Sequence, residues 1–154
     1  MLAYSLTEKK PVAIRYPKGV AENIEGKYPF AGPDWDVLMQ GENGSILTFG
    51  ACIPEGMQIA AELGWSLIDA RSLKPLDEGM LNKIKDKPLC VIEDNAPQGG
   101  LCEAVLHYYS DQNISVCVRG FSLEDAFVAV GTVEQQKEKN HMDAKYILEQ
   151  LKQL

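Results

Sequence analysis

Apolar and polar positions follow two distinct patterns along the chain. Five short apolar runs have the length and β-branched content of strands, and they cover residues 35–40, 45–49, 65–70, 89–93 and 114–118. The segments between and after them repeat apolar residues at the spacing of amphipathic helices. Strands that alternate with helices predict parallel strands covered on both faces. The sequence therefore indicates an α/β fold: a three-layer α/β/α sandwich with a five-stranded, mostly parallel sheet.

The first strand is expected to be the one antiparallel member of this sheet. Its apolar side chains Trp35, Val37 and Met39 are predicted to lie on one face, and the turn at residues 41–44 is short and contains two glycines. Two strands joined by so short a turn run in opposite directions, whether they pair directly or lie on either side of a third strand.

Start and stop signals delimit the predicted helices. Pro54 suits the first turn of a helix, and Gly64 suits its left-handed C-terminal stop. The buried stripe of this helix is predicted to comprise Met57, Ala60, Ala61 and Leu63. Short polar side chains precede the later helices, and the predicted N-caps are Asp77, Thr132 (in a capping-box pattern with Gln135) and Asp143.

Charge and composition narrow the classes of partner. The net charge of −7 argues against a surface for nucleic acid or anionic membrane, because phosphate binding needs clustered Lys and Arg. No apolar run approaches the roughly 20 residues needed to span a bilayer, and no signal-peptide core follows the start, so a cytoplasmic protein is expected. The cysteines lack CxxC spacing and are predicted to be reduced, mostly buried thiols at Cys52, Cys90, Cys102 and Cys117.

The candidate site lies where the fourth predicted strand ends. Glu93, Asp94 and Asn95 follow that strand, and Gly99 and Gly100 precede a helical pattern. Open α/β sheets place ligands or partner surfaces at such strand-to-helix corners.

Each feature of this corner has two interpretations. Glu93 and Asp94 are either an acid–base pair or, in the favoured interpretation, caps of the following turn. The glycine pair either allows close approach of a ligand or backbone, or is a plain tight turn. Familiar cofactor and hydrolase motifs are absent from the sequence, so no catalytic or metal-binding residue is assigned. Both histidines, His107 and His141, are expected to be exposed on helices.

Five segments occur in an order and spacing that resemble a known family. They are residues 13–19 (Ala-Ile-Arg-Tyr-Pro-Lys-Gly), Val37-Leu38 with Gly41, residues 46–50, residues 68–78 (including Lys-Pro-Leu-Asp-Glu), and residues 93–95 with the glycine pair. Together they resemble the C-terminal third of 1-deoxy-D-xylulose-5-phosphate synthases, thiamine-diphosphate enzymes related to transketolase. The resemblance extends over roughly residues 11–125; beyond Phe121, the Pro-Asp and His-Gly pieces usual in the family are not evident.

The resemblance implies an activity and cofactors. These enzymes join pyruvate to glyceraldehyde 3-phosphate, release CO2 and form 1-deoxy-D-xylulose 5-phosphate, a precursor of isoprenoids, thiamine and pyridoxal. They use thiamine diphosphate and Mg²⁺ and work as homodimers. Because their cofactor-binding motifs lie in preceding domains, this chain is expected to bind neither cofactor and to be inactive alone, as a dimer-forming C-terminal domain.

A domain division follows from the resemblance and from composition. Residues 20–34 contain two prolines and two glycines without a sustained period, which is typical of a linker. Residues 1–19 are then the end of an upstream pyrimidine-binding domain, and residues 35–154 form the transketolase C-terminal-like domain. The partners expected are the upstream domains and a second copy.

One residue role carries over from the family. The first arginine of its Arg-Tyr-Pro-Arg-Gly segment helps to hold the substrate phosphate, and Arg15 occupies that position; the second arginine is Lys18 here. A fork of N–H donors suits a phosphate. The alternative is that Arg15 pairs with an acid at the domain junction.

Two other functions remain open at this point. The chain could be the C-terminal domain of another transketolase-like enzyme or of a 2-oxoacid dehydrogenase. It could also be a free-standing, non-enzymatic α/β interaction module, in which residues 1–19 would be ordered without a partner.

Overall fold

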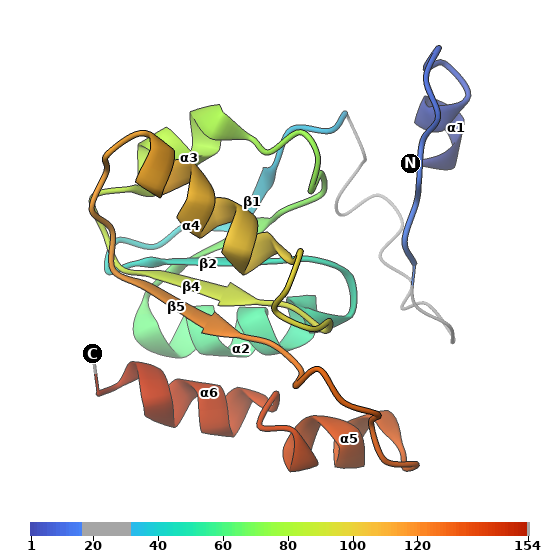
Figure 1. The fold of residues 1–154 in the computed structure, drawn as a ribbon. Coiled ribbons are helices and arrows are strands. Elements are labelled where there is room, and N and C mark those ends of the chain that lie inside the picture. Colours follow the sequence, from blue (N-terminus) through green and yellow to red (C-terminus); the bar gives the residue numbers. More distant parts are fainter. Residues whose placement is uncertain (17–31, 154) are drawn as a thin grey trace.

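The computed structural model describes residues 1–16 and 32–153 (Figure 1). Lys18 and most of the predicted linker, residues 20–31, lie outside the described residues. The strands are β1 Asp36–Met39, β2 Ser45–Thr48, β3 Ser66–Asp69, β4 Leu89–Ile92 and β5 Val118–Phe121. The helices are α1 Leu2–Ser5, a 3-10 turn at Gly50–Cys52, α2 Ile53–Leu63, α3 Glu78–Ile84, α4 Leu101–Asp111, α5 Val133–Lys139 and α6 Ala144–Leu151.

The five strands form one sheet in the order β1-β3-β2-β4-β5. Only β1 is antiparallel, paired with β3, while β2 pairs in parallel with β3 and β4, and β4 with β5. Figure 1 shows α3 and α4 over one face and α2 and α6 over the other, with α5 beyond the ends of the strands. The predicted three-layer sandwich is therefore confirmed, and β1 is antiparallel to β2 across β3.

Two apolar cores fill the space between the layers. Alternate side chains of the parallel strands point to opposite faces, so that Ile46 and Leu67 pack towards α2 and α6, whereas Leu47 and Ile68 pack towards α3 and α4. The parallel strands β2 and β4 are buried along their whole length. This double burial explains why the sequence shows them as continuous apolar runs instead of alternating ones.

The predicted helix boundaries are confirmed, and one buried stripe is corrected. Gly64 ends α2 with a φ of 65°, and the three predicted N-caps each accept a backbone N–H of the following helix through their side chains. In α2, however, Ile59 is 1% exposed and Ala61 is exposed. The stripe centres on Gly56, Ile59 and Ala60, because Gly56 brings the helix against Leu67 of the sheet.

The prediction that Trp35, Val37 and Met39 share one face is wrong. The pairing of β1 with β3 shifts register between Val37 and Met39, which is a β-bulge. One extra residue in a strand reverses the sheet face to which each later side chain of that strand points. Trp35 and Val37 accordingly pack in the α3/α4 core and Met39 in the α2/α6 core.

The last strand begins four residues later than predicted. Residues 114–117 are not part of the strand, although Ile114 and Val116 are partly buried in the α3/α4 core. An edge strand can extend only as far as its neighbour, and β4 starts at Leu89, just after Pro88, which has no N–H to donate. Cys117 lies before the strand and is exposed, in contrast to its predicted burial in a strand.

The cysteines should differ sharply in reactivity. All four are free thiols; Cys52 and Cys90 are buried, and burial raises the pKa of Cys52 to about 12 and that of Cys102 to about 11. Because the thiolate is the nucleophile, we expect a thiol reagent at pH 8 to label Cys117 rapidly and the other three only on unfolding. Peptide mapping after brief and denatured labelling checks this, and a fast second site would contradict it.

Within the described parts of the chain, no helix has both the length and the apolar character required to cross a membrane.

Candidate functional site

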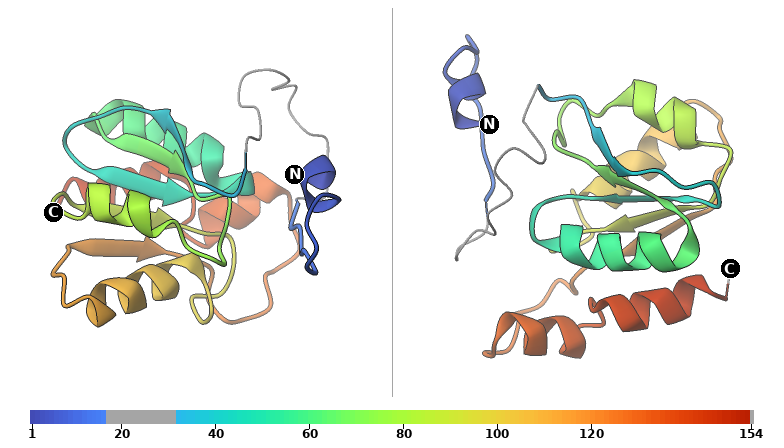
Figure 2. Two further views of the ribbon diagram at one scale, coloured as in Figure 1. Left: turned by 90° about the horizontal axis from the view of Figure 1, so that it is seen from above. Right: turned by 180° about the vertical axis from the view of Figure 1, so that it is seen from behind.

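The candidate site lies at the carboxyl end of the parallel strands. Residues 93–95 follow β4, Phe49 follows β2, and Arg15 reaches the same corner from the N-terminal segment. Figures 1 and 2 show residues 1–16, in blue, beside this end of the sheet. Three segments of the family resemblance, separate in the sequence, thus meet at one place.

Glu93 is the most deeply buried polar group of the corner. Its side chain is 0% exposed, and its carboxylate accepts the backbone N–H of Leu101 at 2.6 Å and of Cys102 at 3.3 Å. It also accepts the side-chain amide of Asn95 at 3.0 Å. The residue at the N-cap position, Gly100, has no side chain to offer. Glu93 therefore caps the start of α4 from the position that follows β4.

Gly99 and Gly100 are required for different reasons, one conformational and one steric. Gly99 has a φ of 73°, which favours glycine, and open space surrounds the position of a Cβ. Gly100 has ordinary extended geometry, but a Cβ there would lie 2.4 Å from Oε2 of Glu93. At Gly100 the group that approaches closely is therefore the Glu93 carboxylate, a side chain, whereas the sequence suggested a ligand or a backbone segment.

Arg15 is held by the turn that follows β4. Its Nη2 lies 2.8 Å from Oδ1 of Asp94 and 3.4 Å from the Asp94 carbonyl oxygen, and its Nη1 donates to Oδ1 of Asn95 at 3.4 Å. The guanidinium also lies over the ring of Phe49, 5.7 Å from its centroid. The Arg15 side chain is still 55% exposed, so it remains accessible to a second anion.

A small pocket opens beside Arg15. It has a volume of about 80 Å³ and is lined by Arg15, Tyr16, Phe49, Gly50, Ala51 and Asp94. One wall is supported from the far side by α5, because Lys137 donates to the Ala51 carbonyl at 3.1 Å and to Glu55 at 2.6 Å. Since ligand sites typically measure about 300–1,000 Å³, this pocket suits one anionic group and not a whole substrate.

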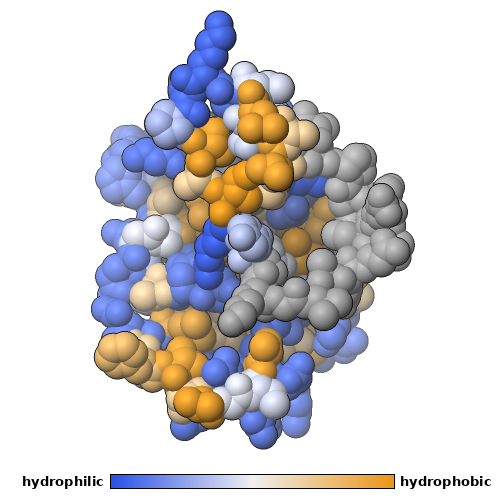
Figure 3. Space-filling model, turned by 90° about the vertical axis from the view of Figure 1, so that its right-hand side faces the viewer, coloured by the Kyte–Doolittle hydropathy of each residue, from blue (hydrophilic) through white to orange (hydrophobic). Residues whose placement is uncertain are grey.

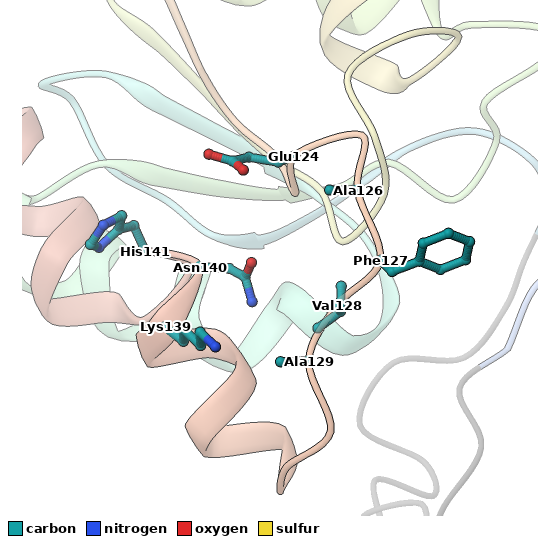
Figure 4. A pocket seen from close by; sticks show the side chains of 8 residues that line it. All are labelled: Glu124, Ala126, Phe127, Val128, Ala129, Lys139, Asn140 and His141. Carbon is teal, nitrogen blue, oxygen red and sulfur yellow. The ribbon is translucent and has the colours of Figure 1, made fainter.

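A second, wider hollow of about 290 Å³ lies between residues 124–129 and the end of α5 (Figure 4). His141, Asn140 and Lys139 line one side, and Phe127 points away from it. His141 stacks on Tyr146 with ring centroids 4.3 Å apart. Its charged lining residues, Glu124 and Lys139, are of opposite sign, and no sequence signal indicated the hollow. Both histidines are exposed, as predicted, but only His107 lies on a helix; His141 lies in the turn between α5 and α6, with a φ of 59°.

The side chain of Arg71, which lies away from this corner, has structural partners. Arg71, at the end of β3, pairs with Asp36 at 2.6 Å and Asp69 at 3.1 Å. Burial raises the pKa of Asp69, and Arg71 opposes that rise. Within residues 1–16 and 32–153, no three His, Cys, Asp or Glu side chains lie close enough together to hold a metal ion.

Comparison with known proteins defines the family. Residues 34–147 match the family described as Transketolase, C-terminal domain. The chain therefore belongs to the transketolase C-terminal domain family.

Comparison with individual curated proteins gives relatives of one particular enzyme class. The chain is 35% identical to a 1-deoxy-D-xylulose-5-phosphate synthase of Halalkalibacterium halodurans, over 96% of this chain and 25% of the relative. It is 32% identical to that of Clostridium tetani, over 100% of this chain and 26% of the relative. The chain thus spans about a quarter of the length of these relatives.

A solved structure has the same fold. A protein described as "Split gene transketolase, inactive beta4 tetramer" superposes with a TM-score of 0.75 over 88% of this chain and 46% of that one. At 22% sequence identity, this likeness concerns the fold.

Proposed function

We propose that this chain is the C-terminal domain of a 1-deoxy-D-xylulose-5-phosphate synthase, which joins pyruvate to glyceraldehyde 3-phosphate with release of CO2. The observation that carries the proposal is the position of Arg15, exposed beside a small pocket at the carboxyl end of the sheet. Identities of 32–36% to enzymes of this name support it.

The remainder of the enzyme is proposed to hold thiamine diphosphate and Mg²⁺. The residues of this chain do not fit these groups: its described part offers no cluster of metal ligands, and its sequence has no Gly-Asp-Gly diphosphate motif. In this proposal the chain alone has no activity. It contributes a substrate contact to a cytoplasmic, homodimeric enzyme, in which residues 1–19 end the pyrimidine-binding domain, residues 20–34 form a linker and residues 35–154 form the C-terminal domain.

Exposed apolar side chains support the presence of a covering partner. All the large hydrophobic side chains exposed in the described residues, apart from Leu73 and Leu106, lie in residues 1–16 or 127–133. Figure 3 views the corresponding face and shows apolar groups at its upper and lower ends. An apolar surface of this kind marks an interaction site. We assign it to the preceding domains, since the relatives are about four times as long as this chain.

The contribution of Arg15 is to bind and orient the substrate phosphate. A guanidinium presents five N–H donors in a planar fork, and contacts to the described residues use three of them. The pairing of Arg15 with Asp94 agrees with the second interpretation of this residue as well. The two interpretations are compatible, because one edge of the fork faces the turn while the side chain stays half exposed.

Replacing Arg15 tests this function. In the intact enzyme, Arg15→Ala is expected to raise KM for glyceraldehyde 3-phosphate about 10- to 150-fold, because a hydrogen bond to a charged group contributes about 1.5–3 kcal/mol. KM for pyruvate, which has no phosphate, should change less than threefold. Steady-state kinetics with each substrate varied in turn measures both constants.

The structure provides a matched control for this experiment. Arg119 on β5 also lies over an aromatic ring, 5.8 Å from the centroid of Phe121, but it does not line the pocket. Arg119→Ala should leave both KM values unchanged. Equal increases for the two substrates in Arg15→Ala would remove Arg15 from the phosphate site.

The polypeptide that precedes this chain separates the alternatives. A Gly-Asp-Gly diphosphate motif in the same polypeptide supports a 1-deoxy-D-xylulose-5-phosphate synthase. A separate subunit that carries the motif supports another transketolase-like enzyme.

A further inference from the structure

The turn that holds Arg15 is itself anchored on both sides. Before it, the backbone N–H of Glu93 donates to the Phe121 carbonyl at 3.0 Å, and the Glu93 side chain caps α4. After it, the Asn95 carbonyl accepts the N–H of Leu123 at 3.0 Å, and the Asn95 amide is bound to Glu93. Asp94 lies between these anchored residues, so the backbone that carries its carboxylate is fixed relative to the sheet.

Arg15, by contrast, comes from a segment with little support of its own. It is in residues 11–16, which form no helix or strand, and more than half of its side chain is exposed. A long side chain in that situation populates many rotamers unless a partner selects one. The partner at the shortest distance is Asp94, at 2.8 Å.

We propose that Asp94 is a positioning residue that holds the Arg15 guanidinium at the mouth of the pocket, ready for the substrate phosphate. This inference rests on the proposed role of Arg15. The Nη2 group of Arg15 contacts the carboxylate and the carbonyl oxygen of Asp94, and its Nη1 group donates to the side chain of Asn95. Phe49 supports the flat face of the guanidinium. The remaining N–H donors of Arg15 are therefore held in one orientation, on the side of the guanidinium away from the Asp94 carboxylate.

Substitution of Asp94 in the intact enzyme tests the inference. Asp94→Ala should raise KM for glyceraldehyde 3-phosphate about tenfold, with kcat and KM for pyruvate within twofold of the unaltered enzyme. Asp94→Glu, which keeps the carboxylate, should restore most of this loss. In the double variant Arg15→Ala/Asp94→Ala, the second change should add nothing, because Asp94 acts only through Arg15.

The outcomes separate the inference from the proposed function. If Arg15→Ala raises KM but Asp94→Ala leaves it unchanged or lowers it, Asp94 has no positioning role and the phosphate contact stands. If Arg15→Ala itself has no selective effect, the proposed role of Arg15 fails and the inference fails with it.

A second measurement does not depend on activity. In the intact enzyme labelled with ¹⁵N-arginine, the Nε–H of Arg15 should give the heteronuclear NOE of an ordered group, and Asp94→Ala should reduce it to that of a mobile side chain. The Nε–H of Arg119 should be the same in both proteins. An equally ordered Arg15 in the absence of the Asp94 carboxylate would overturn the inference.

Discussion

Replacing Gly100 with alanine is expected to lower the free energy of unfolding of the chain by about 3–5 kcal/mol. The added methyl group would lie 2.4 Å from Oε2 and 2.7 Å from Oε1 of Glu93, and overpacking of this kind costs about 1–3 kcal/mol. The buried carboxylate cannot move away without leaving the N–H groups of Leu101 and Cys102 unpaired, at about 1–3 kcal/mol each. Urea unfolding followed by circular dichroism measures the difference.

Gly99→Ala is the matched control for this substitution. Its methyl group meets no atom within 4 Å, but the φ of 73° disfavours any L-residue, so it should cost only about 1–2 kcal/mol. The neighbouring substitutions therefore separate steric overlap from backbone strain. Equal losses in the two variants would mean that Glu93 does not approach the backbone as closely as described.

Removing the Glu93 carboxylate should have the other large effect. Glu93→Ala leaves the N–H groups of Leu101 and Cys102 without this acceptor, whereas the side-chain amide of Asn95 keeps its bond to the Ala96 carbonyl at 2.8 Å. At about 1–3 kcal/mol for each of these two N–H groups, the expected loss of unfolding free energy is about 2–6 kcal/mol. Glu93→Gln, which keeps one oxygen, should lose about 2 kcal/mol. Thermal and urea unfolding of the purified chain measure these values.

The same pair of variants decides between the two interpretations of Glu93. Glu149→Gln on α6 changes an exposed carboxylate and should alter stability by less than about 0.5 kcal/mol. If Glu93→Gln behaves like this control but abolishes turnover in the intact enzyme, then Glu93 acts as an acid or base and its capping contacts contribute little to stability.

Local patterns in the sequence were sufficient for most of the fold. The strands β2 and β4 are short, apolar and β-branched, and each cap depends on residues within three positions of it. Such signals act over a few residues, so they can be found without knowledge of the remainder of the chain. The parallel sheet then follows from the alternation of strands and helices.

The features that the sequence did not predict all depend on distant neighbours. The bulge in β1 exists only relative to β3, and the start of β5 is set by where β4 begins. In α2 the choice between Ile59 and Ala61 depends on how Gly56 rests on the sheet. None of these relations between elements can be derived from the spacing of residues within a single element.

The candidate site shows the same limit. The residues Arg15 and Asp94 were each identified by resemblance, but their contact joins positions 79 apart in the chain. Likewise, both carboxylates at the end of β4 looked equivalent in the sequence. Burial separates them, because Glu93 is enclosed and caps a helix whereas Asp94 is 35% exposed and faces the arginine.

The bond from Lys137 to Ala51 links α5 to the wall of the pocket, across 86 positions of sequence. Shortened or tagged versions of the protein that disturb α5 would release that carbonyl and loosen the loop after β2. Changes confined to α5 would in this protein reach the surroundings of Arg15 without altering any residue near it.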